Sequence, residues 1–320
     1  MFRQIPTVLS AEEILNRAFK NAKKIQITDI NALYKKKKTI IAKTESFSKS
    51  LNSTLERYVK KFPSIDNLPL FYQELIDIKI SVDKLKKALG AVDWARKTCQ
   101  LIYSKQSKSL KKFQKINFLM KKQQEIYGRI SSVVKQIDKE LSVLNEAQKI
   151  MKKFPDIKDI PTVVIAGYPN VGKSSLLRCL SSAKPKIAQY PFTTKEIHVG
   201  HMLKKEKHVT QRFQIIDTPG LFDRPFSKRN IIEKQAIAAL SHLADVIIFV
   251  IDPTETCGYT INDQKHLLTH VNKMFMNSSI IIIENKADLK KTDSKFLKVS
   301  CKNCEGIKPL VEKIYSNFKL

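Results

Sequence analysis

The chain has 320 residues, enough for two domains, an apolar content of 42% that is ordinary for globular folds, and a net charge of +28. No stretch contains the roughly 18 apolar residues of a membrane span, and the N-terminus lacks a hydrophobic signal core, which argues against a membrane partner and against export. The five cysteines are an odd number without disulfide spacing, so a reducing interior and a cytoplasmic location are expected.

The excess positive charge lies mainly in the first half of the chain. Residues 1–158 contain 34 basic and 15 acidic residues, a net charge of +19, whereas residues 159–320 carry +9. A polyanion is therefore expected to meet the first half, and among polyanions RNA is favoured and DNA is not expected. Basic runs such as Lys35 to Lys38 can also serve only as solvated helix faces, and this alternative stays open.

The first half is predicted to be helical almost throughout. Apolar residues recur at spacings of three and four, and only two of the eight glycines precede residue 160. Ser10 and Glu13 form a capping box that opens the first helix, and Pro63 stops a second one. Two further helices carry the stripes Phe71, Leu75, Ile78, Val82, Leu85 and Leu89, and Ile126, Ile130, Val133, Ile137, Leu141, Leu144 and Met151. An antiparallel bundle over residues 1–158 is the expected result.

From about Asp159 the pattern changes to short β-branched segments that alternate with helical ones. The predicted strands are residues 163–166, 213–216, 246–251 and 280–283. This alternation predicts an α/β domain over residues 159–320, with a mostly parallel sheet between helices on both faces. Ligands of such domains bind at the carboxyl ends of the strands.

A glycine-rich loop follows the first of these strands. Residues 167–174 match the P-loop pattern G-x-x-x-x-G-K-[ST] and lead into a predicted helix. The N–H groups of such a loop bind phosphates, Lys173 is predicted to reach the β- and γ-phosphates, and Ser174 is predicted to bind Mg²⁺. The predicted nucleotide contacts here are Gly167, Tyr168, Pro169, Asn170, Val171, Gly172, Lys173, Ser174 and Ser175.

Two polar segments further along the chain complete a predicted phosphate and metal site. Thr193 and Thr194 lie in a loop at a distance from Ser174 at which a threonine can ligate Mg²⁺ and sense the γ-phosphate. Asp217 directly follows a strand and is predicted to hold Mg²⁺ through water, and the Gly220 N–H to contact the γ-phosphate. The predicted metal ligands are therefore Ser174, Thr194 and Asp217.

The segment Asn285-Lys286-Ala287-Asp288, behind the last apolar strand, predicts the base. A carboxylate at Asp288 can accept from the N1–H and the exocyclic amine of guanine, whereas adenine has no N1 donor. Asn285 is predicted to bond N7 and tie down the P-loop, and the Lys286 stem to stack on the ring. Ser300, Cys301 and Lys302 follow one more strand, where a backbone N–H can approach the guanine carbonyl. The predicted ligands are GTP and GDP.

The motifs GYPNVGKS, YPFTT, DTPG and NKAD, in this order, resemble the Obg-type branch of translation-factor-related GTPases. More narrowly, the segments IPTVLSAEEILNRAFKNA, DTPGLFDRPFSKRN and CGYTINDQ resemble the nucleolar GTP-binding protein 1 family, over essentially the entire chain. The resemblance implies a helical bundle and a GTPase domain docked on ribosomal RNA during assembly of the large ribosomal subunit. Eukaryotic members carry long C-terminal extensions, whereas this sequence ends at Leu320, so a compact archaeal-type member is expected.

The catalytic residues predicted are Lys173, Thr194, Gly220 and Asn170. Ras-like enzymes orient the attacking water with a Gln after the DxxG glycine, but Leu221 occupies that position, so slow intrinsic hydrolysis is expected. Asn170 resembles the asparagine of GTPases that coordinate K⁺ beside the phosphates, or it only closes the loop; both interpretations stay open. His198 and His201 are expected on a strand, pointing away from the site.

Three functions are compatible with these patterns. The leading hypothesis is a GTPase switch in large-subunit assembly that binds a ribosomal precursor and its RNA. The second is a nucleotide-gated RNA-binding module in which turnover is incidental. The third is a GTPase that signals only through protein partners, with the basic helices serving solubility. The lone pair Cys301 and Cys304 lacks the second pair that a zinc site needs, so no metal is expected there.

Overall fold

The computed structural model describes residues 2–112, 115–189, 196–206, 209–219, 221 and 231–318. The chain divides into two compact units, one formed by Met1–Asn67 and Lys79–Lys152, the other by Leu68–Ile78 and Lys153–Leu320. The domain bounds 1–158 and 159–320 stay a prediction. In the described residues, none of the helices combines the length and apolarity of a membrane-spanning helix.

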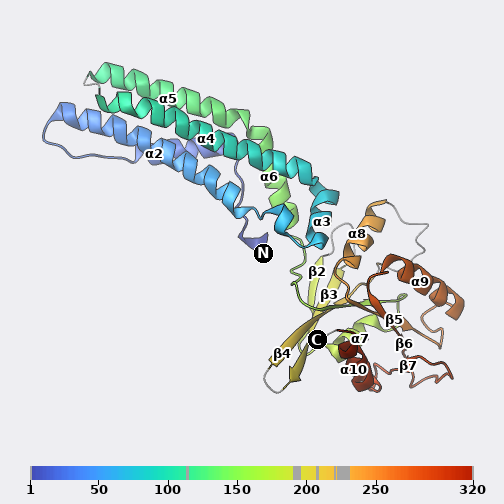
Figure 1. Cartoon of the computed structure of the whole chain (residues 1–320). Helices are drawn as coiled ribbons and strands as arrows, with labels where there is room; N and C mark the ends of the chain where they lie inside the picture. The colour runs from blue at the N-terminus through green and yellow to red at the C-terminus, as the bar shows by residue number, and fades with distance from the viewer. Residues whose placement is uncertain are drawn as a thin grey trace. The chain divides into compact units, whose positions relative to one another are not determined.

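The first unit is a helical bundle (Figure 1). Its helices are α1 (Ala11–Lys23), α2 (Ala32–Lys61), α4 (Val82–Lys112), α5 (Ile116–Gln136) and α6 (Asp138–Met151), with 3₁₀ turns η1 (Phe2–Gln4) and η2 (Ile65–Asn67). The predicted capping box at Ser10 and Glu13 is confirmed, as is the end of the second helix just before Pro63. The core side chains Phe47, Leu51 and Leu55 are fully buried, which accounts for the apolar spacing of α2.

Both long stripes predicted as single helices are broken in the structure. The first divides at Ser81, whose φ of 69° interrupts the helix between α3 (Leu70–Ile80) and α4. The second divides at Ile137, where α5 ends and α6 begins. The Asp138 carboxylate there accepts a 2.8 Å hydrogen bond from the Ala11 N–H, which fixes the start of α6 against α1. Apolar spacing continues through both breaks, so the sequence pattern did not reveal them.

The second unit contains, within the described residues, a seven-stranded sheet in the order β2-β3-β4-β1-β5-β6-β7. The strands are β1 (Thr162–Ala166), β2 (Lys186–Gln189), β3 (Glu196–Glu206), β4 (Val209–Asp217), β5 (Val246–Ile251), β6 (Ser279–Glu284) and β7 (Leu297–Lys298). The pairings from β4 through β1, β5 and β6 to β7 are parallel, and β2-β3 and β3-β4 are antiparallel. The mostly parallel sheet and all four predicted strands are confirmed.

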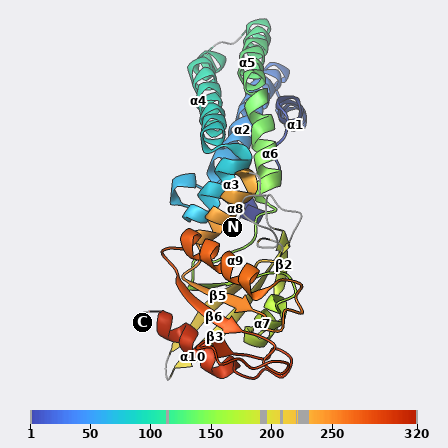
Figure 2. The same ribbon diagram turned by 90° about the vertical axis from the view of Figure 1, so that its right-hand side faces the viewer.

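Helices cover both faces of this sheet (Figure 2). The helices α7 (Lys173–Leu180) and α10 (Ile307–Asn317) pack on one face, and α8 (Ile231–Ser241) and α9 (Ile261–Met274) on the other. The beginning of α3 also belongs to this unit: the Tyr72 hydroxyl is buried and donates to the Pro155 and Ile157 carbonyls at 2.8 and 3.0 Å. Because β1, β4, β5 and β6 pair in parallel, their carboxyl ends lie along one edge of the sheet.

Candidate nucleotide-binding site

The glycine-rich loop after β1 has the backbone that close approach to an anion requires. Gly167 and Gly172 have φ values of 146° and 101°, and a Cβ at Gly172 would lie 2.1 Å from the Asn285 side-chain nitrogen. Asn170 is exposed and also has a positive φ, 61°. Gly172 is the N-cap of α7, so the free N–H groups at the start of that helix lie behind the loop.

Lys173, Ser174 and Asp217 lie together where β1 and β4 end. The Ser174 hydroxyl donates to Asp217 Oδ2 at 2.5 Å, and both Asp217 and Lys173 are buried. The Lys173 ammonium donates to the Tyr168 carbonyl at 2.6 Å. Among the described residues, the second Asp217 oxygen, Oδ1, is buried and has no hydrogen-bond partner. A buried carboxylate oxygen left unpaired beside a serine hydroxyl is an oxygen-rich set that fits Mg²⁺ and its waters.

His198 lies closer to this group than the sequence predicted. It is on β3, directly opposite Asp217 in the antiparallel pairing with β4, and its Nδ1 is 3.4 Å from Asp217 Oδ2. The expectation that His198 points away from the site is therefore wrong, because cross-strand partners share a face of the sheet. The contact between His198 and Asp217 depends on the pairing of β3 with β4, which the sequence did not specify.

The loops after β6 and β7 are joined to the P-loop by one buried side chain. The Asn285 amide donates to the Val171 carbonyl at 2.8 Å, and its oxygen accepts from the Cys301 N–H at 3.1 Å. Asp288 is exposed and accepts a 2.7 Å hydrogen bond from the buried Ser300 hydroxyl, which holds the pKa of Asp288 below its usual value. Asp288 is therefore an ionised acceptor at neutral pH. Lys302 is exposed beside it.

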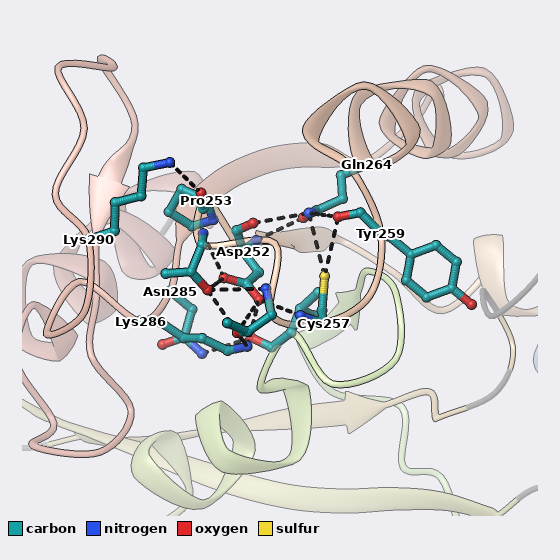
Figure 3. A network of polar contacts seen from close by, with 11 residues as sticks. Asp252, Pro253, Cys257, Tyr259, Gln264, Asn285, Lys286 and Lys290 are labelled. Atoms are coloured by element: carbon teal, nitrogen blue, oxygen red, sulfur yellow. Dashed lines mark hydrogen bonds and ion pairs between the residues drawn. The ribbon is translucent and has the colours of Figure 1, made fainter.

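A polar network after β5, shown in Figure 3, had no counterpart in the sequence prediction. Asp252 is fully buried, and its Oδ2 accepts from the Lys286 ammonium at 2.6 Å and from the Cys257 N–H at 2.9 Å. The buried Gln264 side chain donates to the Asp252 and Tyr259 carbonyls at 3.0 and 3.1 Å. This network fixes the CGY segment, whose only sequence signal was its family resemblance.

The same segment packs against the P-loop through two aromatic rings. Tyr259 stacks on Tyr168 with ring centroids 3.9 Å apart and an interplanar angle of 16°. Stacked aromatic pairs contribute about 0.5–1.5 kcal/mol beyond area burial. Tyr259 therefore packs against the P-loop, and Asp252 holds the Lys286 ammonium.

Three of the predicted site residues lie outside the described part of the chain. Thr193, Thr194 and Gly220 are not among the described residues, so their predicted metal and phosphate contacts stay predictions. Leu221 is buried with 2% of its surface exposed, in keeping with an apolar side chain that does not orient water. The remaining loop residues lie in one stretch from β1 to α7: Tyr168 and Val171 are buried, and Pro169 and Ser175 are half-buried.

We expect Asp252→Asn to lower the free energy of unfolding by about 2–4 kcal/mol at pH 7, since it leaves the Lys286 ammonium without its carboxylate and points an amide at the Cys257 N–H. Burial raises the pKa of Asp252, but hydrogen bonds from Lys286 and Thr254 outweigh it, so the net pKa is lowered. The stabilisation is then present above the unfolded-state pKa of about 4 and is lost as the pH falls through the lower folded-state value.

Urea unfolding followed by circular dichroism, from pH 7 down to pH 3, measures this difference. The matched control is Asp293→Asn, the same chemical change at an exposed position after β6. A difference between wild type and Asp252→Asn that stays constant through the acid range would show that the carboxylate charge is not the source of the stabilisation.

A mostly parallel sheet, with a loop of P-loop sequence after β1 and an Asn-Lys-x-Asp segment after β6, defines the P-loop GTPase class. The family model described as 50S ribosome-binding GTPase matches residues 162–286 and agrees with this class. The model of the NOG1 N-terminal helical domain matches residues 2–158. The chain belongs to the nucleolar GTP-binding protein 1 family and is a GTP-binding protein of that family.

Two individual relatives match this sequence over 90% of its length. An uncharacterized protein of Methanocaldococcus jannaschii is 37% identical over 292 residues, which are 90% of this chain and 81% of that protein. Nucleolar GTP-binding protein 1 of Arabidopsis thaliana is 33% identical over 90% of this chain, which spans only 43% of the plant protein. A crystal structure assigned to the same family, from Plasmodium falciparum, is 34% identical over 51% of this chain and 89% of its own, with a TM-score of 0.44.

One expectation from the sequence is overturned by these names. The eukaryotic relatives from Arabidopsis thaliana and Saccharomyces cerevisiae are named nucleolar GTP-binding proteins, which points to the nucleolus rather than the general cytoplasm. The predicted cytoplasmic location is therefore wrong. It rested on the cysteine count, the missing signal core and the resemblance to a compact archaeal-type member. The first two distinguish a reducing interior from export but not one interior compartment from another.

Proposed function

We propose that this protein binds GTP and GDP with Mg²⁺, hydrolyses GTP, and acts as a switch in assembly of the large ribosomal subunit through contacts with precursor RNA. The observation that carries the proposal is the convergence of Lys173, Asp217 and Asn285 from three strand ends. The Asn285 amide links the P-loop to the loop that holds Ser300 and Cys301. Both the phosphate end and the base end of a nucleotide then have protein groups at fixed positions.

In the proposed mechanism each group has a separate task. Lys173 orients the β- and γ-phosphates, and the N–H groups at the start of α7 bind their oxygens. Ser174, and Asp217 through water, would hold Mg²⁺, which would supply positive charge beside the phosphates. Asp288 accepts from guanine, and the Asp252 carboxylate holds the Lys286 ammonium at the far end of its stem. Thr193, Thr194 and Gly220 complete the γ-phosphate contacts in this proposal, and Asn170 is the candidate K⁺ ligand.

Buried Leu221 favours slow intrinsic turnover, which leaves the nucleotide-gated RNA-binding module as the second candidate. Single-turnover GTP hydrolysis, measured with and without large-subunit precursor particles, separates the two. A switch enzyme should be stimulated by the particles at least about tenfold, a modest threshold beside the roughly 10³- to 10⁵-fold that a catalytic group supplied in trans gives to GTPases. A rate unchanged by particles that nevertheless co-sediment with the protein would favour the RNA-binding module.

The basic end of the helical unit gives a prediction about RNA. The beginnings of α2 and α5 lie at the same end of the bundle (Figure 1), and the Gln123 amide donates to the Ile40 carbonyl at 3.2 Å. Lys35, Lys36 and Lys121 are exposed there. The triple substitution of these lysines by Gln should make the slope of log K against log salt less steep by about 2, since each phosphate contact contributes roughly 0.7 to 0.9 through counterion release.

Filter binding of the intact chain to ribosomal RNA across a salt series measures this slope. The intact chain is needed because residues 68–78 belong to the second unit, so a cut at residue 158 would divide that unit. The matched control replaces the exposed Lys265, Lys308 and Lys313 of the second unit by Gln, with the same loss of charge. Equal effects of the two triple variants would mean that the lysines of the bundle act only through net charge, and the solubility hypothesis would gain.

A further inference from the structure

Three of the five cysteines meet beside the base-binding loops. Cys179 lies in α7, and Cys301 and Cys304 lie in the turn after β7. The Sγ atoms of Cys179 and Cys304 are 2.9 Å apart, and Cys179 Sγ is 3.5 Å from the Cys301 carbonyl oxygen. A disulfide bond measures about 2.05 Å, so these two sulfurs need to approach by less than about 1 Å to be bonded.

The surroundings of the thiols assign different roles to them. Cys304 is the one exposed cysteine of the five; Cys99 and Cys257 are buried, and Cys179 and Cys301 are half-buried. Burial raises the pKa of Cys179 to about 11 and that of Cys301 to about 12. Cys304 is therefore the thiol that a dissolved reagent meets first. In the described residues, no group of three or more His, Cys, Asp or Glu side chains could hold a metal ion, so metal binding does not explain the cluster.

The turn that carries Cys304 is fixed in place. Ser300 and Glu305 exchange two backbone hydrogen bonds of 3.1 Å, which close the turn. The same turn supplies the Ser300 hydroxyl to Asp288 and the Cys301 N–H to Asn285. Cys179 lies in the helix that begins with Lys173 and Ser174. A covalent bond between the two sulfurs would therefore join the phosphate-binding helix to the base-binding turn.

We propose that Cys179 and Cys304 form a dithiol site that a hydroperoxide converts to a disulfide, and that this bond slows nucleotide release. The second clause rests on the function proposed above. The Cys304 sulfur attacks the hydroperoxide, so that an S–O bond forms, the O–O bond breaks and, with hydrogen peroxide, one water leaves. The Cys179 sulfur then attacks the resulting sulfenic acid; the S–S bond forms and the oxygen leaves as a second water with the remaining thiol proton. Two thiols are oxidised by two electrons, and a dithiol reductant reverses the reaction.

Peptide mapping tests the site without any nucleotide. Trypsin cuts after Lys298 and Lys302, so Cys301 and Cys304 fall in separate peptides, 299–302 and 303–313, and Cys179 falls in 179–186. After hydrogen peroxide, the peptides 179–186 and 303–313 should appear as one species lighter by two hydrogens. Cys301→Ser should leave this species intact, and Cys304→Ser should abolish it. A bond between 299–302 and 303–313, or oxidation without any cross-link, would overturn the assignment.

Release of labelled GDP tests the consequence. The oxidised wild-type protein should release GDP at least about threefold more slowly than the reduced protein, because opening of the site often limits release. Oxidant should not change the rate in Cys179→Ser or Cys304→Ser, neither of which removes a predicted nucleotide contact. A mapped disulfide with an unchanged release rate would overturn the coupling. Failure of the reduced wild type to bind GDP at all would instead refute the proposed function, and the mapped dithiol site would stand.

Discussion

The Lys173→Ala variant should lose at least about 100-fold in affinity for GTP and GDP, corresponding to about 3 kcal/mol or more. Lys173 is buried at the start of α7, and its ammonium donates a 2.6 Å hydrogen bond to the Tyr168 carbonyl. The backbone of the P-loop therefore holds the ammonium in place. Substitution removes the positive charge of Lys173 from the predicted phosphate cradle. Ser174→Ala should show the same loss in the presence of Mg²⁺, because it removes the hydroxyl beside Asp217.

Isothermal titration with GDP and circular dichroism on the same samples measure binding and fold together. The matched control is Lys308→Ala, an exposed lysine near the start of α10 that has the same chemistry and lies outside the predicted site. The control should bind as the wild type does. Binding of GDP by folded Lys173→Ala within about tenfold of the wild-type affinity would contradict the role of the loop.

The Asp288→Asn variant should bind xanthine nucleotides in preference to guanine nucleotides. The carboxylate is ionised because the Ser300 hydroxyl donates to it and lowers the pKa of Asp288, so it can only accept hydrogen bonds. Guanine offers two donors to it. An amide at this position can instead donate to the C2 oxygen of xanthine, and it leaves one guanine donor unpaired. We expect GTP affinity to fall about 100-fold, since a polar site left unpaired discriminates strongly between ligands.

Competition titrations with GTP, xanthosine triphosphate and ATP measure the exchange. Asp293→Asn, the same substitution at an exposed position five residues further on, should leave the preference for guanine unchanged. The wild type should not bind ATP measurably in the same assay. Equal affinity of the wild type for ATP and GTP would refute the assignment of the base-binding segment.

The sequence by itself determined the two kinds of structure and the order of the motifs. Apolar spacing predicted helices before residue 158, and β-branched runs predicted the four strands that carry the loops of Lys173, Asp217 and Asn285. These patterns are local: period, caps and turn residues act within a few positions of one another, so they can be recognised without knowing what each element packs against.

The tertiary structure decided the features that depend on elements distant in the sequence. The breaks at Ser81 and Ile137 are invisible in the stripes. His198 faces Asp217 because β3 pairs with β4 in one register, and a shift of one residue would have turned it to the other face. Asp252 contacts Lys286, 34 residues further along the chain, and Cys179 contacts Cys304, 125 residues further along. Such contacts form only when the strands are ordered in the sheet, which no local pattern specifies.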